Sequence, residues 1–221
     1  MKKLNLYLSS VDKIQRYSPI YNEISSEERI LDVGGGDGTI AFFNKGNDTT
    51  ILDINEEELK KSEKLGLKTI KASGDKIPFP DKSFDTVLSI ASLEHVPPNK
   101  RLEYLQELKR VASKKILIYF PTGKKAEKYD RKLFNFRKKI GKHDKWTEEH
   151  IKNGLPSIDL ITKTFSNPKI KYIQNADVWY LIMLIQTIPI FNKFLPGLVY
   201  TILKSLDRKP PFIGVFVKCN L

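Results

Sequence analysis

The chain has 221 residues, of which 40% are hydrophobic and 29% charged, and this composition excludes a disordered protein. A chain of this length is expected to form one domain. The formal net charge is +12, and it is unevenly distributed, because the window 109–145 holds fourteen lysines and arginines against three acidic residues. This basic window suits nucleic acid, an anionic lipid or an acidic substrate, or it is simply a solvated lysine-rich face.

Cysteine and histidine usage is sparse. The single cysteine, Cys219, cannot form an internal disulfide, which fits a reducing compartment. The three histidines do not have the spacing of a zinc site, so no metal is expected. The N-terminal segment lacks the apolar run of a signal peptide. We therefore expect a cytoplasmic protein, with contact to a membrane surface as an open alternative.

Short apolar runs alternate with helical patterns along the chain. Runs rich in strand-forming residues and bounded by turn residues predict seven strands, at 29–33, 49–54, 67–72, 84–90, 115–120, 169–174 and 212–218. Helices are predicted at 56–65, with Asn55 as its cap, and at 99–111, 124–140, 147–153 and 157–165. Strands that alternate with helices indicate a parallel sheet covered on both faces.

The segment 178–203 is very apolar. Gln186 and Pro189 interrupt it, and a membrane-spanning helix needs about twenty continuous apolar residues, so a spanning helix is not expected. Three interpretations remain open: helices buried in the core, a dimer face, or a lid that touches lipid or an apolar acceptor.

The most informative segment is 30–40, Ile-Leu-Asp-Val-Gly-Gly-Gly-Asp-Gly-Thr-Ile, in which a buried strand leads into a loop and then a predicted helix. The loop has glycines at alternate positions: Gly34, Gly36 and Gly38. Glycine allows positive φ angles and a close approach of a ligand to the backbone. Asp32 precedes the loop, where a carboxylate suits a cationic amino group and disfavours a pyrophosphate. The next strand ends near Asp53, which can accept both hydroxyls of a ribose.

At these residues the sequence resembles the class I S-adenosylmethionine (SAM)-dependent methyltransferases, of the type 11 domain kind that acts on small molecules. The similarity continues through 72–89, Ala-Ser-Gly-Asp-Lys-Ile-Pro-Phe-Pro-Asp-Lys-Ser-Phe-Asp-Thr-Val-Leu-Ser, and through 92–96, Ser-Leu-Glu-His-Val. It covers about residues 29–120. The resemblance implies a three-layer Rossmann-like α/β fold, with a mostly parallel seven-stranded sheet, an antiparallel last strand and a helical insertion before that strand.

The resemblance also implies how the chain is organised. One methyltransferase domain would span 1–221, with an N-terminal helical cap at 1–28. A cofactor-binding half would occupy 29–120. A substrate-side half would occupy 121–221 and contain the helical insertion at about 177–206.

The implied cofactor is SAM, with S-adenosylhomocysteine (SAH) as its product. The implied cofactor contacts are the three loop glycines with Asp32 at the methionine part, Asp53 at the ribose, Ile54, Asp75 and Lys76 at the adenine, and Ala91 at the methionine end. Turn or helix capping is the alternative role for the carboxylates of Asp53 and Asp75.

His95, just beyond the fourth strand, is the candidate general base, because an imidazole with a pKa near 6.5 can take a proton at neutral pH. Glu94 is a weaker candidate, with helix capping or solvent exposure as its alternative. Packing, or a place in the cofactor pocket, is the alternative role for His95. The candidate substrate residues, with ordinary packing as the alternative, are Tyr17, Tyr21, Trp146 and His150.

The expected function is methyl transfer from SAM to a small-molecule acceptor such as a glycan, a lipid or a quinone-like compound. An NAD-dependent oxidoreductase is one alternative, since residues 36–41 fit Gly-x-Gly-x-x-Ala, but Asp32 would repel the pyrophosphate of NAD. An RNA-binding or RNA-methylating protein is another alternative, which would use the basic window. The segment 89–92, Ser-Ile-Ala-Ser, lacks the Asn-Pro-Pro-Tyr-like signature of amino-group methylation, so nucleic acid is not favoured.

Overall fold

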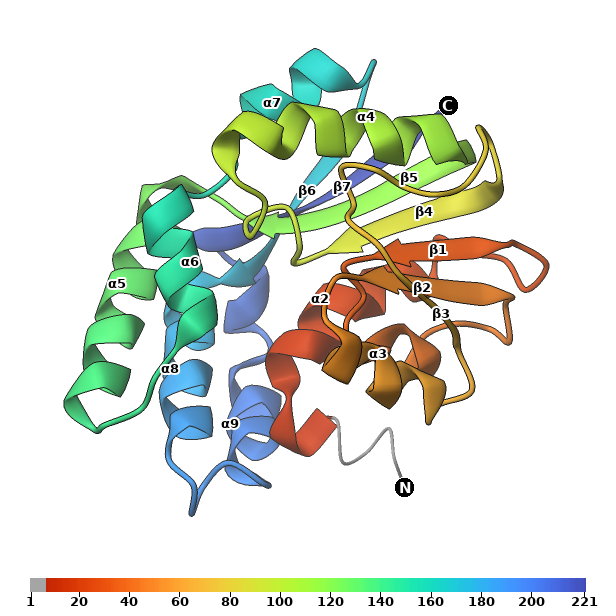
Figure 1. The fold of residues 1–221 in the computed structure, drawn as a ribbon. Coiled ribbons are helices and arrows are strands. Elements are labelled where there is room, and N and C mark those ends of the chain that lie inside the picture. The colour runs from red at the N-terminus through yellow and green to blue at the C-terminus, as the bar shows by residue number, and fades with distance from the viewer. Residues whose placement is uncertain (1–6) are drawn as a thin grey trace.

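The computed structural model describes residues 7–221. Its centre is one seven-stranded sheet with the order β3-β2-β1-β4-β5-β7-β6 (Figure 1). The strands are β1 (Ile30–Val33), β2 (Thr49–Asp53), β3 (Lys68–Lys71), β4 (Phe84–Ile90), β5 (Ala112–Pro121), β6 (Lys169–Asn175) and β7 (Phe212–Asn220). The first five pair in parallel, whereas β7 runs antiparallel to both of its neighbours, β5 and β6. The predicted mostly parallel sheet with an antiparallel last strand is confirmed.

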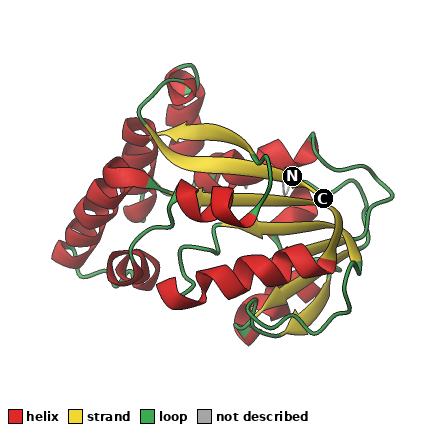
Figure 2. Cartoon of the chain, turned by 90° about the horizontal axis from the view of Figure 1, so that it is seen from above, coloured by secondary structure: helices red, strands yellow, loops and turns green. Residues whose placement is uncertain are grey.

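Helices cover both faces of the sheet (Figure 2). Helices α4 (Arg101–Val111) and α7 (Ile158–Thr164) pack on one face, and α2 (Val11–Tyr21) and α3 (Glu56–Glu63) on the other. Successive side chains of a strand point to opposite faces, so Val87 joins the core under α4 while Leu88 joins the core under α2. This gives the predicted three layers. Residues 1–6 of the predicted N-terminal cap lie outside the described residues.

A second group of helices lies beside the sheet, on the left in Figure 1. It consists of α5 (Gly123–Lys139), α6 (Lys145–Asn153), α8 (Ala176–Thr187) and α9 (Leu195–Leu203). The apolar segment of the sequence forms α8 and α9, between β6 and β7, which confirms the predicted helical insertion. Val178 and Ile182 of α8 are buried against α2 and α9. No helix within residues 7–221 is both long and apolar enough to cross a membrane.

The predicted helix after the glycine loop is wrong. The structure has a single 3-10 turn there, η1 (Thr39–Phe42), followed by an irregular connection to β2. The connection contains Asn44, Gly46 and Asn47, and Gly46 has a φ of +83°. Residues of this kind favour turns, and too few residues remain before β2 for a regular helix. By contrast, the Asn55 side chain accepts the N–H groups of Glu57 and Glu58 at the start of α3, which confirms it as the cap.

Candidate active site

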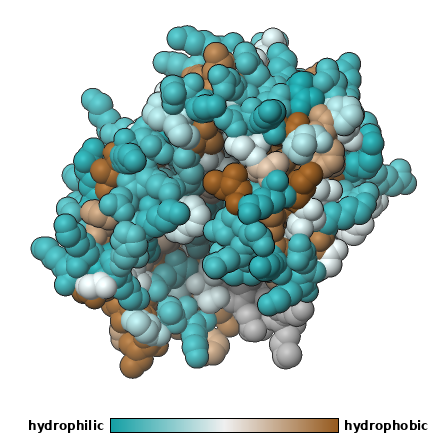
Figure 3. All heavy atoms as spheres, in the orientation of Figure 1, coloured by the Kyte–Doolittle hydropathy of each residue, from teal (hydrophilic) through white to brown (hydrophobic). Residues whose placement is uncertain are grey.

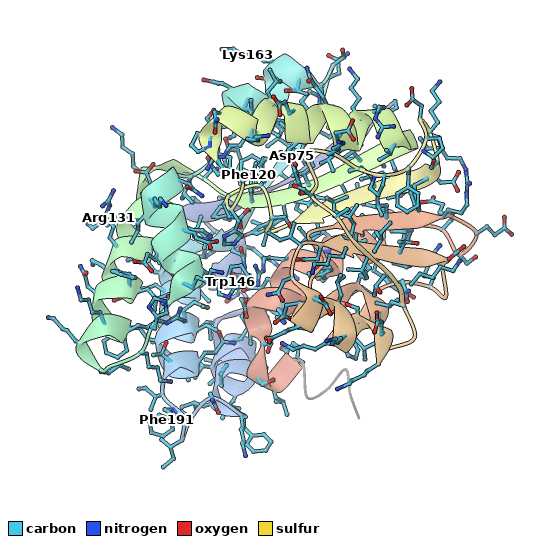
Figure 4. All side chains as sticks on the ribbon, in the orientation of Figure 1. Asp75, Phe120, Arg131, Trp146, Lys163 and Phe191 are labelled. Carbon is cyan, nitrogen blue, oxygen red and sulfur yellow. The ribbon has the colours of Figure 1, made fainter. Side chains whose placement is uncertain are left out.

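A cavity of about 780 Å³ opens at the carboxyl ends of the parallel strands. This position follows from the strand order, because the chain runs outward from β1 to β2 and β3 on one side and from β4 to β5 on the other. The change of direction between β1 and β4 makes a crevice at that end of the sheet. The loops after β1, β2, β3 and β4 form one side of the cavity, and residues of α5, α6 and α8 form the other. Figure 4 marks two of the lining residues, Asp75 after β3 and Trp146 on α6.

The glycine loop needs glycine at the predicted positions. Gly34, Gly36 and Gly38 have φ angles of +73°, +48° and +73°, in the left-handed region that side chains disfavour. A Cβ atom on Gly34 would lie 2.4 Å from Oγ of Ser92, so the loop packs directly against the segment after β4. Gly34 and Gly36 line the cavity, whereas Gly38 turns away and packs against Ser62 of α3.

Asp32 lies beneath the loop rather than in the cavity wall. Its side chain is fully buried, and the Tyr17 hydroxyl donates a hydrogen bond to its Oδ2 at 3.4 Å. Its Oδ1 has no hydrogen-bond partner among residues 7–221. Burial, together with the negative charges of Asp53 and Asp37, raises the pKa of Asp32 to about 7. A cation above the loop would therefore stabilise the ionised carboxylate.

The end of β2 brings a carboxylate and an apolar side chain to the cavity. Asp53 accepts the Gly36 N–H through Oδ2 at 3.0 Å and the Asn55 N–H through Oδ1 at 2.8 Å. These two bonds hold the carboxylate against the loop, where each oxygen keeps further acceptor capacity. Ile54 is 71% exposed at the cavity edge. The Asp53 carboxylate is suited to a ribose, and the Ile54 side chain to the flat base attached to that ribose.

The loops after β3 and β4 complete this end of the cavity. Asp75 accepts hydrogen bonds from Ser73 and from Lys100, the latter at 2.9 Å, and both partners lower the pKa of Asp75. Ala91 lines the cavity with a φ of +55°, and its N–H donates to the Tyr119 carbonyl at 2.9 Å. Lys76, predicted beside Asp75, is not among the lining residues.

At the opposite end of the cavity, two histidines approach each other. The rings of His95, after β4, and His150, on α6, have centroids 4.8 Å apart. Nδ1 of His95 lies 2.9 Å from Oε2 of Glu149, and Nδ1 of His150 lies 3.0 Å from Oδ2 of Asp130. Trp146 packs edge-on against His95, at 4.9 Å between centroids, although half of its surface is exposed. The structure therefore brings three of the predicted residues together: His95, Trp146 and His150.

The electrostatic environment differs between these two imidazoles. Burial and the positive charges of His150 and Arg16 lower the pKa of His95 to about 3, so its imidazole is neutral and takes up a proton only weakly. Burial alone would lower the pKa of His150, but the hydrogen bond to Asp130 and the charge of Glu94 raise it instead. Burial raises the pKa of Glu94. The assignment of His95 as a general base stays a prediction.

The two tyrosines predicted near the substrate are separated by the structure. Tyr17 lies in the cavity wall and reaches Asp32. Tyr21, one helical turn further along α2, is 47% exposed, and its ring lies 4.7 Å from Nζ of Lys45, away from the residues that line the cavity. Tyr17 and Tyr21 are four residues apart and therefore lie on the same face of α2. Tyr21 is the last residue of the helix, which extends past the cavity at that end.

Arg101 holds two parts of the site together, and the sequence analysis did not single it out. It is 6% exposed, and its guanidinium donates to four backbone carbonyls, those of Glu94, Val96, Asn153 and Gly154, at 3.4, 3.0, 3.4 and 2.5 Å. It therefore ties the segment after β4, which carries His95, to the end of α6, which carries His150. No local motif indicates this role, because its acceptors are backbone atoms of a distant helix.

The comparisons with known proteins agree with the fold and the loop. A family model described as a methyltransferase domain matches residues 31–120. The protein named ubiquinone/menaquinone biosynthesis C-methyltransferase UbiE of Rickettsia rickettsii (strain Sheila Smith) is 31% identical over 180 residues, 72% of this chain and 71% of that protein. The protein of the same name from Rickettsia bellii (strain OSU 85-389) is 33% identical over 151 residues, and this chain covers 61% of its length.

Two solved structures have the same fold. A SAM-dependent methyltransferase from Archaeoglobus fulgidus has a TM-score of 0.58 with 19% identity, over 96% of this chain and 94% of that one. A SAM-dependent methyltransferase from Thermotoga maritima has a TM-score of 0.59 with 15% identity, over 99% of this chain and 94% of that one. A Rossmann-like methyltransferase fold with a glycine loop and a carboxylate at the end of β2 thus defines the class of protein. The chain belongs to the class I SAM-dependent methyltransferase family.

Proposed function

We propose that this protein transfers a methyl group from SAM to a small-molecule acceptor. The observation that carries the proposal is that one continuous cavity joins the glycine loop and Asp53, at one end, to His95 and His150 at the other. A donor bound at the first end and an acceptor bound at the second would meet inside the same cavity. The proposal assigns cofactor binding to residues 29–120 and acceptor binding mainly to 121–221.

The residues at the first end fit SAM. The Asp53 carboxylate has acceptor capacity for ribose hydroxyls, and the exposed face of Ile54 suits the flat adenine. The partnerless oxygen of buried Asp32 lies just below the loop, where a nearby positive charge is favourable. Asp75, held by Lys100, can accept from an adenine amino group.

When bound, SAM supplies a methyl group on a cationic sulfur, which is already activated for displacement. The protein then has to align the acceptor with that carbon and to exclude water. As the new bond to the methyl carbon forms, the carbon–sulfur bond breaks and its electron pair stays on sulfur. Neutral His95 would contact the acceptor, and its low proton affinity favours orientation over strong base catalysis.

The lining of the second end favours an acceptor with an apolar body and a polar reacting edge. Leu133, Trp179 and Met183 contribute apolar surface to the cavity, beside the histidine pair. Similarity to proteins named as quinone-biosynthesis C-methyltransferases supports a quinone-like acceptor. Lipids with a hydroxylated headgroup and glycans are the other acceptor classes to compare.

Calorimetric titration with SAM and SAH tests the cofactor part of the proposal. We expect micromolar binding, and a loss of at least about tenfold in Asp53→Asn, which removes the charged acceptor for the ribose. Glu57→Gln is the matched control, because Glu57 is exposed on the neighbouring turn of α3 and does not line the cavity. Absence of binding by the folded wild-type protein would refute the proposal.

Transfer of a radiolabelled methyl group from SAM tests the acceptor part. Hydroquinones, hydroxylated lipids and glycans are compared with RNA as acceptors, with SAH formation measured in parallel. Labelling of a hydroquinone that His95→Ala reduces by at least about tenfold would support the assignment. Labelling of RNA alone would replace the small-molecule acceptor by the nucleic-acid alternative.

We also propose that the protein docks on an anionic membrane through an exposed apolar tip at α8 and α9. The tip is formed by five side chains that are 45–82% exposed: Ile190, Phe191, Phe194, Leu198 and Ile202. Figure 3 shows apolar residues gathered at the lower end of the molecule, and Figure 4 shows Phe191 there. Scattered apolar residues are ordinary on a surface, but a contiguous set usually contacts something.

Basic residues lie next to this tip. The segment 188–206 contains Lys193 and Lys204 and no acidic residue. The end of the basic window joins it, because Arg137 and Lys142 both donate hydrogen bonds to Thr187 at the end of α8. Exposed apolar side chains with basic residues beside them are suited to the headgroup region of an anionic bilayer.

Vesicle sedimentation tests this docking. We expect the protein to bind vesicles that contain phosphatidylglycerol, and to bind phosphatidylcholine alone more weakly. Phe194→Ser with Ile202→Ser should reduce binding by at least about tenfold, because two large apolar groups no longer leave water. Leu102→Ser on α4 is the control, since Leu102 is exposed at another part of the surface. A dimer in solution that the double variant makes monomeric, without vesicle binding, would assign the tip to a second copy instead.

A further inference from the structure

Three potential metal ligands meet at the acceptor end of the cavity. One ligand atom each from Glu94, His95 and His150 lies within 4.8 Å of the other two. Among residues 7–221, Oε2 of Glu94 and Nε2 of His150 are buried without any hydrogen-bond partner. A buried polar atom without a partner is costly, so the folded chain gains if a ligand supplies what these two atoms lack.

Both histidines are already held in the way that metal-bound histidines are held. A ligating imidazole usually donates its other ring N–H to a carboxylate, which fixes the ring and makes it a better ligand. Here Nδ1 of His95 is paired with Glu149, and Nδ1 of His150 with Asp130. These contacts assign the proton to Nδ1 in each ring, which leaves both Nε2 atoms as electron-pair donors.

We propose that Glu94, His95 and His150 bind a divalent transition-metal ion of the zinc class. Two imidazoles and one carboxylate are the ligands of catalytic zinc sites with an open position, and imidazole nitrogen disfavours magnesium or calcium. Tetrahedral zinc needs ligand atoms roughly 3.4 Å from one another. The present atoms lie within 4.8 Å, so the three side chains would move together on binding. His150 is on α6 and the other two follow β4, so the ion would also link the two sides of the cavity.

At the acceptor end of the cavity the ion would activate the methyl acceptor. This role rests on the proposed methyl transfer. An acceptor hydroxyl bound at the open position would lose its proton to water, and the metal would stabilise the resulting oxyanion. The oxygen, or a ring carbon conjugated with it, would then form the bond to the methyl carbon. No further co-reactant is needed, and no residue has to act as a strong base.

The sequence alone does not indicate this site, because the ligands are neighbours only in the folded chain. Glu94 and His95 are adjacent, and His150 is more than fifty residues further on. That spacing matches no short metal motif. The elements that bring them together are held by Arg101, whose carbonyl acceptors include those of Glu94 and Asn153.

Metal titration of the full chain, stripped with a chelator, tests the inference directly. We expect one Zn²⁺ to bind per chain, as measured in competition with a chromogenic chelator. One Co²⁺ should bind in its place and give the visible absorption bands of a low-symmetry site with nitrogen and oxygen ligands. Glu94→Gln and His150→Gln should weaken Zn²⁺ binding by at least about 100-fold, and Asp130→Asn by about 10–100-fold through the loss of its support to His150. His143→Gln is the matched control, because the His143 side chain is 76% exposed.

SAH titration of the same variants separates this inference from the proposed function. Their SAH affinity should remain that of the wild-type protein, which also demonstrates that they fold. Wild-type protein that binds SAH but neither Zn²⁺ nor Co²⁺ would overturn the metal site alone. Equal Zn²⁺ affinity in wild type, Glu94→Gln and His150→Gln would overturn it as well, whereas metal binding without SAH binding would overturn the methyltransferase assignment.

Discussion

At the scale of single residues, the contact between Gly34 and Ser92 leaves no room for a side chain at position 34. Gly34→Ala would place a Cβ atom 2.4 Å from Oγ of Ser92 in a left-handed conformation. We expect a loss of about 2–4 kcal/mol in the free energy of unfolding and at least about tenfold weaker SAH binding. The measurements are urea unfolding and calorimetry.

Gly66→Ala is the control for this prediction. Gly66 also has a positive φ, +80°, but a Cβ atom there would meet nothing within 4 Å. It should cost about 1 kcal/mol from backbone strain alone, with unchanged SAH affinity. Equal effects of the two substitutions would mean that the collision with Ser92 is relieved by movement of the loop.

The carboxyl group of Asp32 should make SAH binding depend on pH. Its pKa is raised to about 7, and the positively charged amino group of SAH favours its ionised form. Affinity should therefore fall several-fold as the pH is lowered from about 7.5 to 5.5, and this dependence should be absent in Asp32→Asn. Calorimetry in buffers of different ionisation enthalpy measures the accompanying proton release. A pH-independent wild-type affinity would contradict the prediction.

The same group should lower the stability of the ligand-free protein at neutral pH. The folded state retains a proton that the unfolded chain releases, so wild-type stability falls as the pH rises from about 4 to 7. Asp32→Asn carries no ionisable group, and above pH 7 it should be more stable than wild type by about 1–3 kcal/mol. Near pH 4 the two proteins should unfold alike, as measured by urea denaturation.

Single residues differ in how far the sequence indicates their roles. The places of Gly34, Gly36 and Asp53 in the cavity wall were predictable, because the loop and the end of the following strand form a local pattern with a direct physical meaning. The depth of Asp32 was not, since the pattern places it beside the loop but does not say that Tyr17 closes over it. The pairing of His150 with Asp130 depends on how α5 meets α6, which no local pattern encodes.

At the scale of elements, Arg101 is the residue that positions α6 against the segment after β4. Arg101→Lys keeps one charge but cannot reach four carbonyls at once, because an ammonium lacks the planar fork of a guanidinium. We expect a loss of about 2–3 kcal/mol in unfolding free energy and a drop in methyl transfer, with SAH affinity retained.

The readouts for Arg101→Lys are acceptor KM, kcat and SAH affinity, measured together. Arg29→Lys is the control, since the Arg29 side chain is 56% exposed and has one long contact, 3.5 Å, to Asp85. An equal loss of SAH affinity and of methyl transfer in Arg101→Lys would indicate general destabilisation rather than positioning.

Elements with a clear periodic pattern were predicted well, and those set by connections were not. The strand at 84–90 was predicted with its observed bounds, because β4 is a continuous buried run between turn residues. The short 3-10 turn after the glycine loop was missed, because the strand and glycine loop were expected to lead into a helix, whereas the chain has Asn44 and Gly46 there. The resemblance to the methyltransferase family implied the α8–α9 insertion, whereas its apolar composition did not indicate which of its side chains are exposed.

At the scale of the whole molecule, the positive net charge is separated in part from the cavity, whose lining holds more acidic than basic side chains. The net charge is +12, while the glycine-loop end of the cavity is bordered by acidic side chains such as Asp37, Asp53 and Asp75. Raising NaCl from about 50 to 500 mM shortens the range of electrostatic attraction and should weaken binding to anionic vesicles strongly. SAH affinity, measured in the same buffers by calorimetry, should change by less than about threefold, and a parallel loss of both would contradict this separation.

The connection between β6 and β7 has a consequence for how the family can diversify. Asn175 and Phe212 are paired neighbours at the ends of these strands, so the segment 176–211 leaves the sheet and returns to it at almost the same point. An insertion with adjacent ends can change length at little entropic cost to the remaining structure. The segment supplies Trp179 and Met183 to the cavity and also carries the apolar tip. If the proposed acceptor site and membrane docking hold, both depend on this one segment, which could be exchanged while the rest of the sheet stays intact.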